Sequence, residues 1–128
     1  EGLPRTRADL DLHREGDFAD TSERAVREFL RDCPDVRIHA GLFPASAAAV
    51  TDERFALVHI DVDIYTSVRD ALRFFHPRVA DGGWIVLDDY DWKHTPGVRA
   101  ALDEFLAGRP ERPLVLAKYQ AALQVRGS

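Results

Sequence analysis

Two largely apolar runs, separated by an amphipathic helical pattern, constrain the fold of this chain most strongly. Residues 55–60 and 84–87 have the composition of buried strands. Between them, residues 66–79 place apolar side chains at helical spacing. A strand, a helix and a second strand in this order form a right-handed crossover unit with two parallel strands. We therefore expect an α/β fold with a mostly parallel sheet.

The same alternation of helices and strands extends over the rest of the chain. The additional elements that we expect are a helix from the cap at residues 20–23 to Pro34, a strand at 36–40, a short alanine-rich helix at 45–51, a helix beginning at Thr95-Pro96, and strands at 113–117 and 121–125. Thr66 or Ser67 is expected to cap the helix at 66–79. The last two strands are close enough in sequence to form an antiparallel hairpin at the sheet edge. We expect residues 1–128 to form one domain, in which polar residues 1–20 are a loop over the active site.

Composition and charge exclude several classes of protein. The net charge of −5 leaves no excess of lysine and arginine to neutralise phosphates, which argues against a nucleic-acid-binding protein. No apolar run approaches the ~20 residues needed to cross a bilayer, and no signal peptide is visible. The single cysteine, Cys33, cannot form an intrachain disulfide. These features predict a cytoplasmic protein that binds neither nucleic acid nor a membrane.

Aspartates follow both central strands at the point where each apolar run ends. Asp61 and Asp63 come after the first strand, and Asp88 and Asp89 come after the second. In open α/β sheets, ligands bind beyond the carboxyl ends of the strands, where these carboxylates would meet. Crowded carboxylates favour a hard cation such as Mg²⁺, Ca²⁺ or Mn²⁺, and they also suit acid/base chemistry. The alternative is that they are helix caps and loop acids, which are common at such junctions.

Several segments with these aspartates resemble the macrocin O-methyltransferase family. The matching segments are Glu1-Gly2-Leu3-Pro4, Phe18-Ala19-Asp20-Thr21, His59-Ile60-Asp61-Val62-Asp63-Ile64-Tyr65, Asp70-Ala71-Leu72, Gly82-Gly83, Leu87-Asp88-Asp89-Tyr90 and Pro96-Gly97-Val98-Arg99. The resemblance implies a Rossmann-like class I methyltransferase fold. It also implies S-adenosylmethionine as the methyl donor, Mg²⁺ as the metal, and a hydroxyl group of a sugar or other natural-product moiety as the acceptor.

The resemblance also implies roles for individual residues. Asp61, Asp88 and Asp89 would hold Mg²⁺, which lowers the pKa of the acceptor hydroxyl and orients its oxygen. Asp63 or Asp61 would remove the hydroxyl proton. We favour Asp63, because a carboxylate that donates its lone pairs to a metal is a poorer base. Tyr65 and Tyr90 either line this pocket or belong to the core.

The cofactor site is less complete in the sequence than the acid cluster. Gly41 and Leu42, in Gly41-Leu42-Phe43, resemble the segment that contacts the adenine ring, and Asp61 is the third candidate cofactor-binding residue. No glycines are arranged as Gly-x-Gly, and in the family the Glu-Gly-Leu-Pro segment follows the second strand. We therefore expect the C-terminal half of a methyltransferase domain, without the first strands and the Gly-rich loop.

Such a half-domain is expected to bind S-adenosylmethionine poorly and to be weakly active or inactive. The alternative function is a non-catalytic remnant that binds metal or associates with itself. Self-association to a homo-oligomer would use the sheet edge that the first strands would otherwise cover.

Overall fold

The computed structural model describes residue 14, residues 16–116 and residues 118–126 of the chain. Its elements, in chain order, are α1 (Glu23–Phe29), the 3₁₀ helix η1 (Ala45–Val50), β1 (Phe55–Ile60), α2 (Tyr65–Phe75), the 3₁₀ helix η2 (His76–Arg78), β2 (Val79–Leu87), α3 (Pro96–Leu106), β3 (Leu114–Val115) and β4 (Ala121–Gln124). Within the described residues, no helix is long and apolar enough to cross a membrane.

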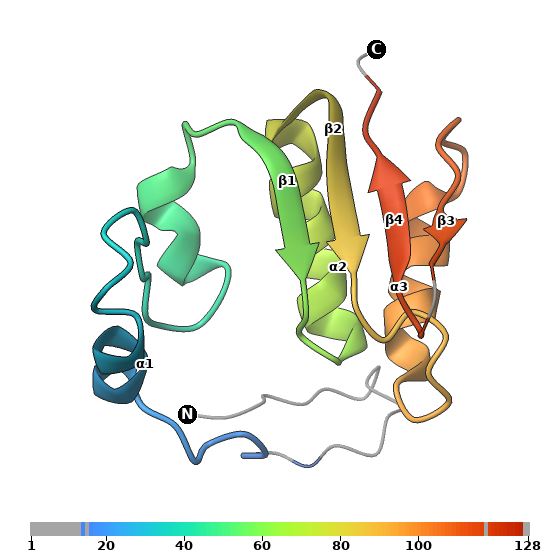
Figure 1. Cartoon of the computed structure of the whole chain (residues 1–128). Helices are drawn as coiled ribbons and strands as arrows, with labels where there is room; N and C mark the ends of the chain where they lie inside the picture. The colour runs from blue at the N-terminus through green and yellow to red at the C-terminus, as the bar shows by residue number, and fades with distance from the viewer. Residues whose placement is uncertain (1–13, 15, 117, 127–128) are drawn as a thin grey trace.

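The four strands form one sheet in the order β1-β2-β4-β3 (Figure 1). β1 and β2 are parallel, with Val58 opposite Ile85. β4 pairs antiparallel with both β2 and β3, which places the closing hairpin at one side of the sheet. The predicted α/β fold, with a parallel crossover unit and an antiparallel C-terminal hairpin, is confirmed.

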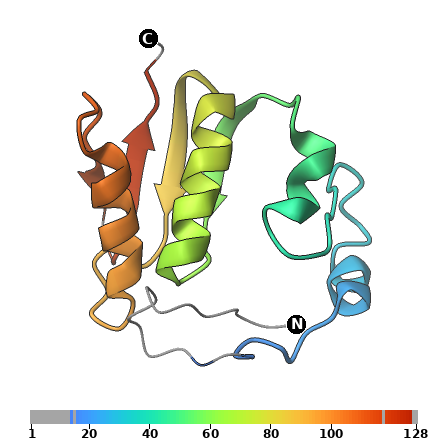
Figure 2. The same cartoon turned by 180° about the vertical axis from the view of Figure 1, so that it is seen from behind.

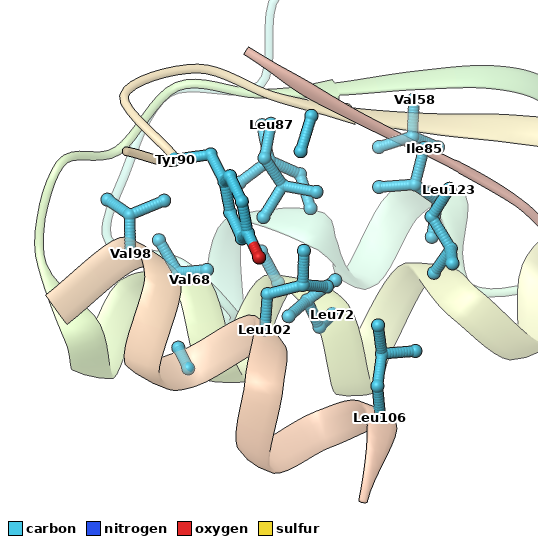
Figure 3. Close-up of a cluster of buried hydrophobic side chains, with 14 of the residues drawn as sticks. Val58, Val68, Leu72, Ile85, Leu87, Tyr90, Val98, Leu102, Leu106 and Leu123 are labelled. Atoms are coloured by element: carbon cyan, nitrogen blue, oxygen red, sulfur yellow. The ribbon is translucent and has the colours of Figure 1, made fainter. Parts of the chain in front are cut away.

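Both long helices cover the same face of the sheet (Figure 2). The core lies between these helices and the sheet. Val58, Ile85 and Leu123 from the sheet meet Leu72 of α2 and Leu102 of α3 there (Figure 3). Each fully buried side chain of this size contributes about 1.5–3 kcal/mol of transfer free energy. On the opposite face, Leu57 of β1 is 61% exposed.

The first turns of α2 and α3 are in close contact because Gly97 has no side chain. A Cβ atom at Gly97 would lie 2.9 Å from both the Cβ and the backbone nitrogen of Tyr65. The helices therefore begin side by side, and the loops that lead into them, residues 61–64 and 88–95, converge at the carboxyl ends of β1 and β2.

The segment before β1 has almost no core of its own. α1 contains no buried residue, and Ala47 is the one buried residue among described positions 16–54. α1 begins within the predicted segment 20–23, but its cap is Ser22 rather than Asp20, and the Ser22 side chain accepts a hydrogen bond of 3.2 Å from the backbone N–H of Ala25. The helix ends at Phe29, before the predicted end at Pro34. Most of the predicted loop at 1–20 lies outside the described residues.

Three further local predictions were wrong. Residues 36–40 form no strand, because no neighbouring strand in the described chain pairs with them, and the Ile38 carbonyl accepts a hydrogen bond from Arg27. The cap of α2 is Ile64, which places the predicted caps inside the first turn. α2 ends at Phe75 rather than near residue 79, since Pro77 cannot donate the next helical hydrogen bond.

Candidate active site

The carboxyl ends of β1 and β2 are adjacent, and an aspartate follows each of them. Ile60 and Leu87 are register partners at the ends of the two strands. The Asp88 backbone N–H donates to the Ile60 carbonyl at 3.0 Å, which extends the pairing into the loops. Asp61 and Asp88 therefore begin two loops that leave the sheet at the same place.

The loops bring three carboxylates together. Oxygen atoms of Asp61, Asp63 and Asp89, one from each residue, all lie within 4.8 Å of one another. Both Asp63 and Asp89 adopt left-handed backbone conformations, with φ of 60° and 57°. Asp63 occupies the centre of a three-residue turn closed by the Ile64 N–H and the Val62 carbonyl at 2.6 Å. A left-handed conformation at a non-glycine residue is uncommon and is concentrated at functional sites.

The neighbouring carboxylates affect the pKa of Asp61. Burial raises the pKa of Asp61 above its usual value, and the negative charges of Asp88 and Asp89 raise it further, while His59 acts in the opposite direction. Asp88 therefore lies within electrostatic reach of the cluster, although its carboxylate is outside the group of three oxygens. An oxygen-only donor set with excess negative charge fits a hard divalent cation such as Mg²⁺.

Thr95 holds the second loop in place. Its side chain is fully buried, and its hydroxyl lies 3.3 Å from the Asp89 carbonyl and 3.5 Å from the Trp92 carbonyl. The Thr95 N–H also donates to the Trp92 carbonyl at 3.1 Å. The sequence predicted Thr95 as the start of a helix, which is confirmed, but it did not reveal this contact with the loop of Asp89.

The two tyrosines beside the acidic segments contact α3. Tyr90 is buried in the core (Figure 3), and its hydroxyl donates to Asp103 at 3.1 Å. The Tyr65 hydroxyl bonds to Glu104. Of the two interpretations that the sequence allowed, core packing is the one observed for Tyr90. Tyr65 packs partly buried against the same cluster.

The candidate cofactor residues divide between two places. Gly41 and Leu42 line an open cleft of about 590 Å³ between α1 and residues 38–42. Leu42 is 54% exposed, so an apolar ring could lie against it. Asp61 is not among the residues that line this cleft. His39 also lines the cleft, whereas His94 contacts the Trp92 ring, and His13 lies outside the described residues.

Comparisons with known proteins connect this geometry to one group of enzymes. Residues 3–114 match the model of the macrocin O-methyltransferase (TylF) family. The demethyldecarbamoylnovobiocin O-methyltransferase of Streptomyces niveus is 31% identical over 100 residues, which cover 75% of this chain and 37% of that protein. The mycinamicin III 3''-O-methyltransferase of Micromonospora griseorubida is 28% identical, over 77% of this chain and 40% of that protein.

A solved structure matches the fold as well as the sequence. The O-methyltransferase NovP superposes with a TM-score of 0.69 and 26% identity, over 83% of this chain and 46% of that one. The chain thus spans less than half the length of these relatives. The match nevertheless includes both central strands, the acid cluster and the Gly41 segment, and the chain belongs to the macrocin O-methyltransferase family.

Proposed function

We propose that this chain forms the acceptor side of an S-adenosylmethionine-dependent O-methyltransferase that methylates a hydroxyl of a sugar or another natural-product moiety. The single observation that carries the proposal is the convergence of Asp61, Asp63 and Asp89 at the strand ends. Membership of the macrocin O-methyltransferase family gives the reaction class, and the two curated relatives are named as O-methyltransferases of natural products.

Asp61 and Asp89 are the residues that we assign to cation binding in every arrangement considered. They come from different strands, and their oxygens lie within 4.8 Å of each other. Thr95 keeps the Asp89 loop in position through its buried hydroxyl. When bound at this site, Mg²⁺ would lower the pKa of an acceptor hydroxyl and orient its oxygen toward the methyl donor.

Asp63 and Asp88 share the two remaining roles. The sequence favours Asp88 as the third metal ligand and Asp63 as the base that removes the hydroxyl proton. The described arrangement also permits the reverse assignment, since the Asp63 oxygen is within reach of Asp61 and Asp89. In either assignment, the carboxylate not used for the metal accepts the proton. Asp61 is the less favoured base, because in both assignments it also binds the metal.

The methyl donor is proposed to lie in the cleft beside Gly41 and Leu42. The cleft offers an exposed apolar side chain and a glycine with a φ of 129°, and this backbone can approach a ligand closely. The chain has no Gly-x-Gly segment of its own to bind the rest of the donor. We therefore expect this 128-residue chain, tested alone, to bind S-adenosylmethionine weakly.

A Mg²⁺ titration by calorimetry tests the assignment. Asp89→Asn is expected to weaken Mg²⁺ binding at least tenfold. If Asp63 is the third ligand, Asp63→Asn should show the same loss and Asp88→Asn should keep Mg²⁺ affinity within about twofold. If Asp88 is the third ligand, these two results should be exchanged. Asp35→Asn, at an exposed position far from the cluster in sequence, is the matched control. Unchanged Mg²⁺ binding in all three variants would exclude a metal site at these aspartates.

A second candidate function follows from the edge of the sheet. β1 is the terminal strand of the described sheet, and Leu57 on it is exposed. An open strand edge with apolar side chains favours pairing with another chain. We propose that this edge supports a homo-oligomer. Sedimentation should then show a concentration-dependent dimer that Leu57→Lys weakens, and a monomer at all concentrations would rule the oligomer out.

A further inference from the structure

A second cavity lies at the end of the sheet opposite the acid cluster. It has a volume of about 510 Å³ and is formed where α2, α3 and β4 end. Figure 1 shows that these three ends lie at the side of the domain away from the loops that follow β1 and β2. The cavity is therefore separate from the proposed methyltransferase site.

Four basic side chains surround this cavity. Arg73 and His76 come from the end of α2 and the start of η2, Arg109 follows α3, and Arg126 follows β4. No carboxylate is among the lining residues. This concentration of positive charge is unusual in a chain whose net charge is −5.

The cavity arginines differ in their partners from several arginines elsewhere in the described chain. Arg27, Arg37 and Arg99, for example, each form an ion pair with a carboxylate. Among the residues that the structure describes, no such ion pair involves Arg73, Arg109 or Arg126.

Arg109 contacts the end of α3, the helix that precedes it. Its Nε donates to the Phe105 carbonyl at 3.0 Å, and its guanidinium carbon lies 4.3 Å from the centre of the Phe105 ring. Its position is therefore set by an aromatic ring and a carbonyl, and its charge is not neutralised by either.

One buried carboxylate, Glu111, contacts His76 without lining the cavity itself. Glu111 is 7% exposed, and its Oε1 lies 3.1 Å from His76 Nε2, while its Oε2 has no hydrogen-bond partner. Burial raises the pKa of Glu111, but a hydrogen bond from its own backbone, the bond to His76 and the charge of Arg109 together leave the pKa below its usual value. A single buried carboxylate balances at most one of the three guanidinium charges.

We propose that this cavity binds the phosphate group of a small organic phosphate. Guanidinium groups bind phosphate oxygens through paired, charge-assisted hydrogen bonds, and three arginines from separate parts of the fold line this cavity. Pro77 and Phe105 form apolar parts of the wall, against which the organic group would pack. The negative end of the helix dipole accounts for cations after α2 and α3, but it does not account for Arg126, which follows a strand.

Calorimetry with inorganic phosphate and phenyl phosphate tests this proposal, at constant ionic strength set by chloride. The variant with both Arg73→Gln and Arg126→Gln is expected to weaken binding of phenyl phosphate at least tenfold. Both side chains are exposed, so the fold should not depend on them. Arg24→Gln, an exposed arginine on α1, is the control and should change affinity less than twofold.

The two probes distinguish the sources of phosphate. Tighter binding of phenyl phosphate would support an organic phosphate that uses the Phe105 wall, and equal binding would limit the site to free phosphate and overturn the organic part of the proposal. A second variant, Arg109→Lys, keeps the charge but loses the paired donors, and we expect it to weaken binding several-fold. No binding above the chloride background, or no effect of these variants, would overturn the site altogether.

Discussion

The part of the chain before β1 and the part from β1 onward differ in how they are held. Residues from Val58 to Val125 supply every member of the hydrophobic cluster, whereas described residues 16–54 contribute one buried side chain, Ala47. The acid cluster belongs to the packed part, and the cleft beside Gly41 and Leu42 belongs to the other. The metal-binding side of the proposed reaction is therefore built on the hydrophobic core, while the donor side lies on a segment that has one buried side chain and packs the partly buried Phe43 against that core.

The largest expected effect comes from removing a core side chain. Leu102→Ala should lower the free energy of unfolding by about 2–5 kcal/mol, because Leu102 is fully buried between α3 and the sheet. Phe29→Ala on α1 should change it by less than about 0.5 kcal/mol, since Phe29 is 84% exposed. Urea denaturation measures both. Equal losses in the two variants would remove the contrast between the two parts of the chain.

The sequence predicted the packed part better than the part before it, for a physical reason. In β1, α2, β2 and α3, the apolar period and the tertiary environment agree, so periodicity identified all four elements. It did not give all their bounds, since β2 begins at Val79 rather than at residue 84 and α2 ends at Phe75. Residues 36–40 alternate like a strand, but a strand also needs a neighbouring strand for its backbone hydrogen bonds. The described chain has no such neighbour there, and the alternation does not reveal this. The start of α1 was located within residues 20–23 because a helix cap is a local interaction, although the cap residue is Ser22 rather than Asp20.

The candidate site shows the same limit. The aspartates could be placed at one sheet edge, because strand ends and crossover direction follow from the order of elements. The left-handed turns at Asp63 and Asp89, and the hydroxyl of Thr95 behind them, depend on how the loops pack. Gly97, which lets α2 and α3 begin side by side, is noticeable in the sequence only as part of the segment 96–99 that resembles the family, because its close approach to Tyr65 depends on how the two helices pack.

A smaller loss of stability is expected for Thr95, whose buried side chain contacts the loop of Asp89. Thr95→Val keeps the volume of the side chain but removes the hydroxyl beside the Asp89 and Trp92 carbonyls, and should cost about 1–2 kcal/mol of stability. If Thr95 positions the Asp89 loop, Mg²⁺ affinity should also fall several-fold, and Thr95→Ser should restore it. A loss of stability without any change in Mg²⁺ affinity would mean that Thr95 has a structural role alone.

The smallest effect on stability is expected for the acid cluster, where removing a charge should stabilise the chain rather than destabilise it. The folded chain raises the pKa of Asp61 through burial and the charges of Asp88 and Asp89. Between the unfolded and folded pKa values the folded state binds more protons, so stability falls as pH rises through this range and the loss persists above it. Asp61→Asn should therefore increase stability at pH 7 without divalent cations, by less than about 1 kcal/mol because the group is exposed.

The control for this prediction is Asp35→Asn, which should leave thermal stability unchanged. Mg²⁺ should stabilise the wild-type chain but not Asp61→Asn. A destabilised Asp61→Asn variant would show instead that Asp61 makes a favourable interaction in the metal-free state.

The central claim is that the carboxyl ends of β1 and β2 form a divalent-cation site, and Mn²⁺ line broadening in amide NMR spectra tests it most directly. Substoichiometric Mn²⁺ should selectively broaden the signals of residues 61–64 and 88–90, which surround the three clustered carboxylates. Signals at the opposite end of the sheet, such as those of residues 73–76 and 109–112, should stay sharp. Asp89→Asn should abolish the selective broadening. Broadening centred on other acidic residues, or a uniform loss of signal, would contradict the account.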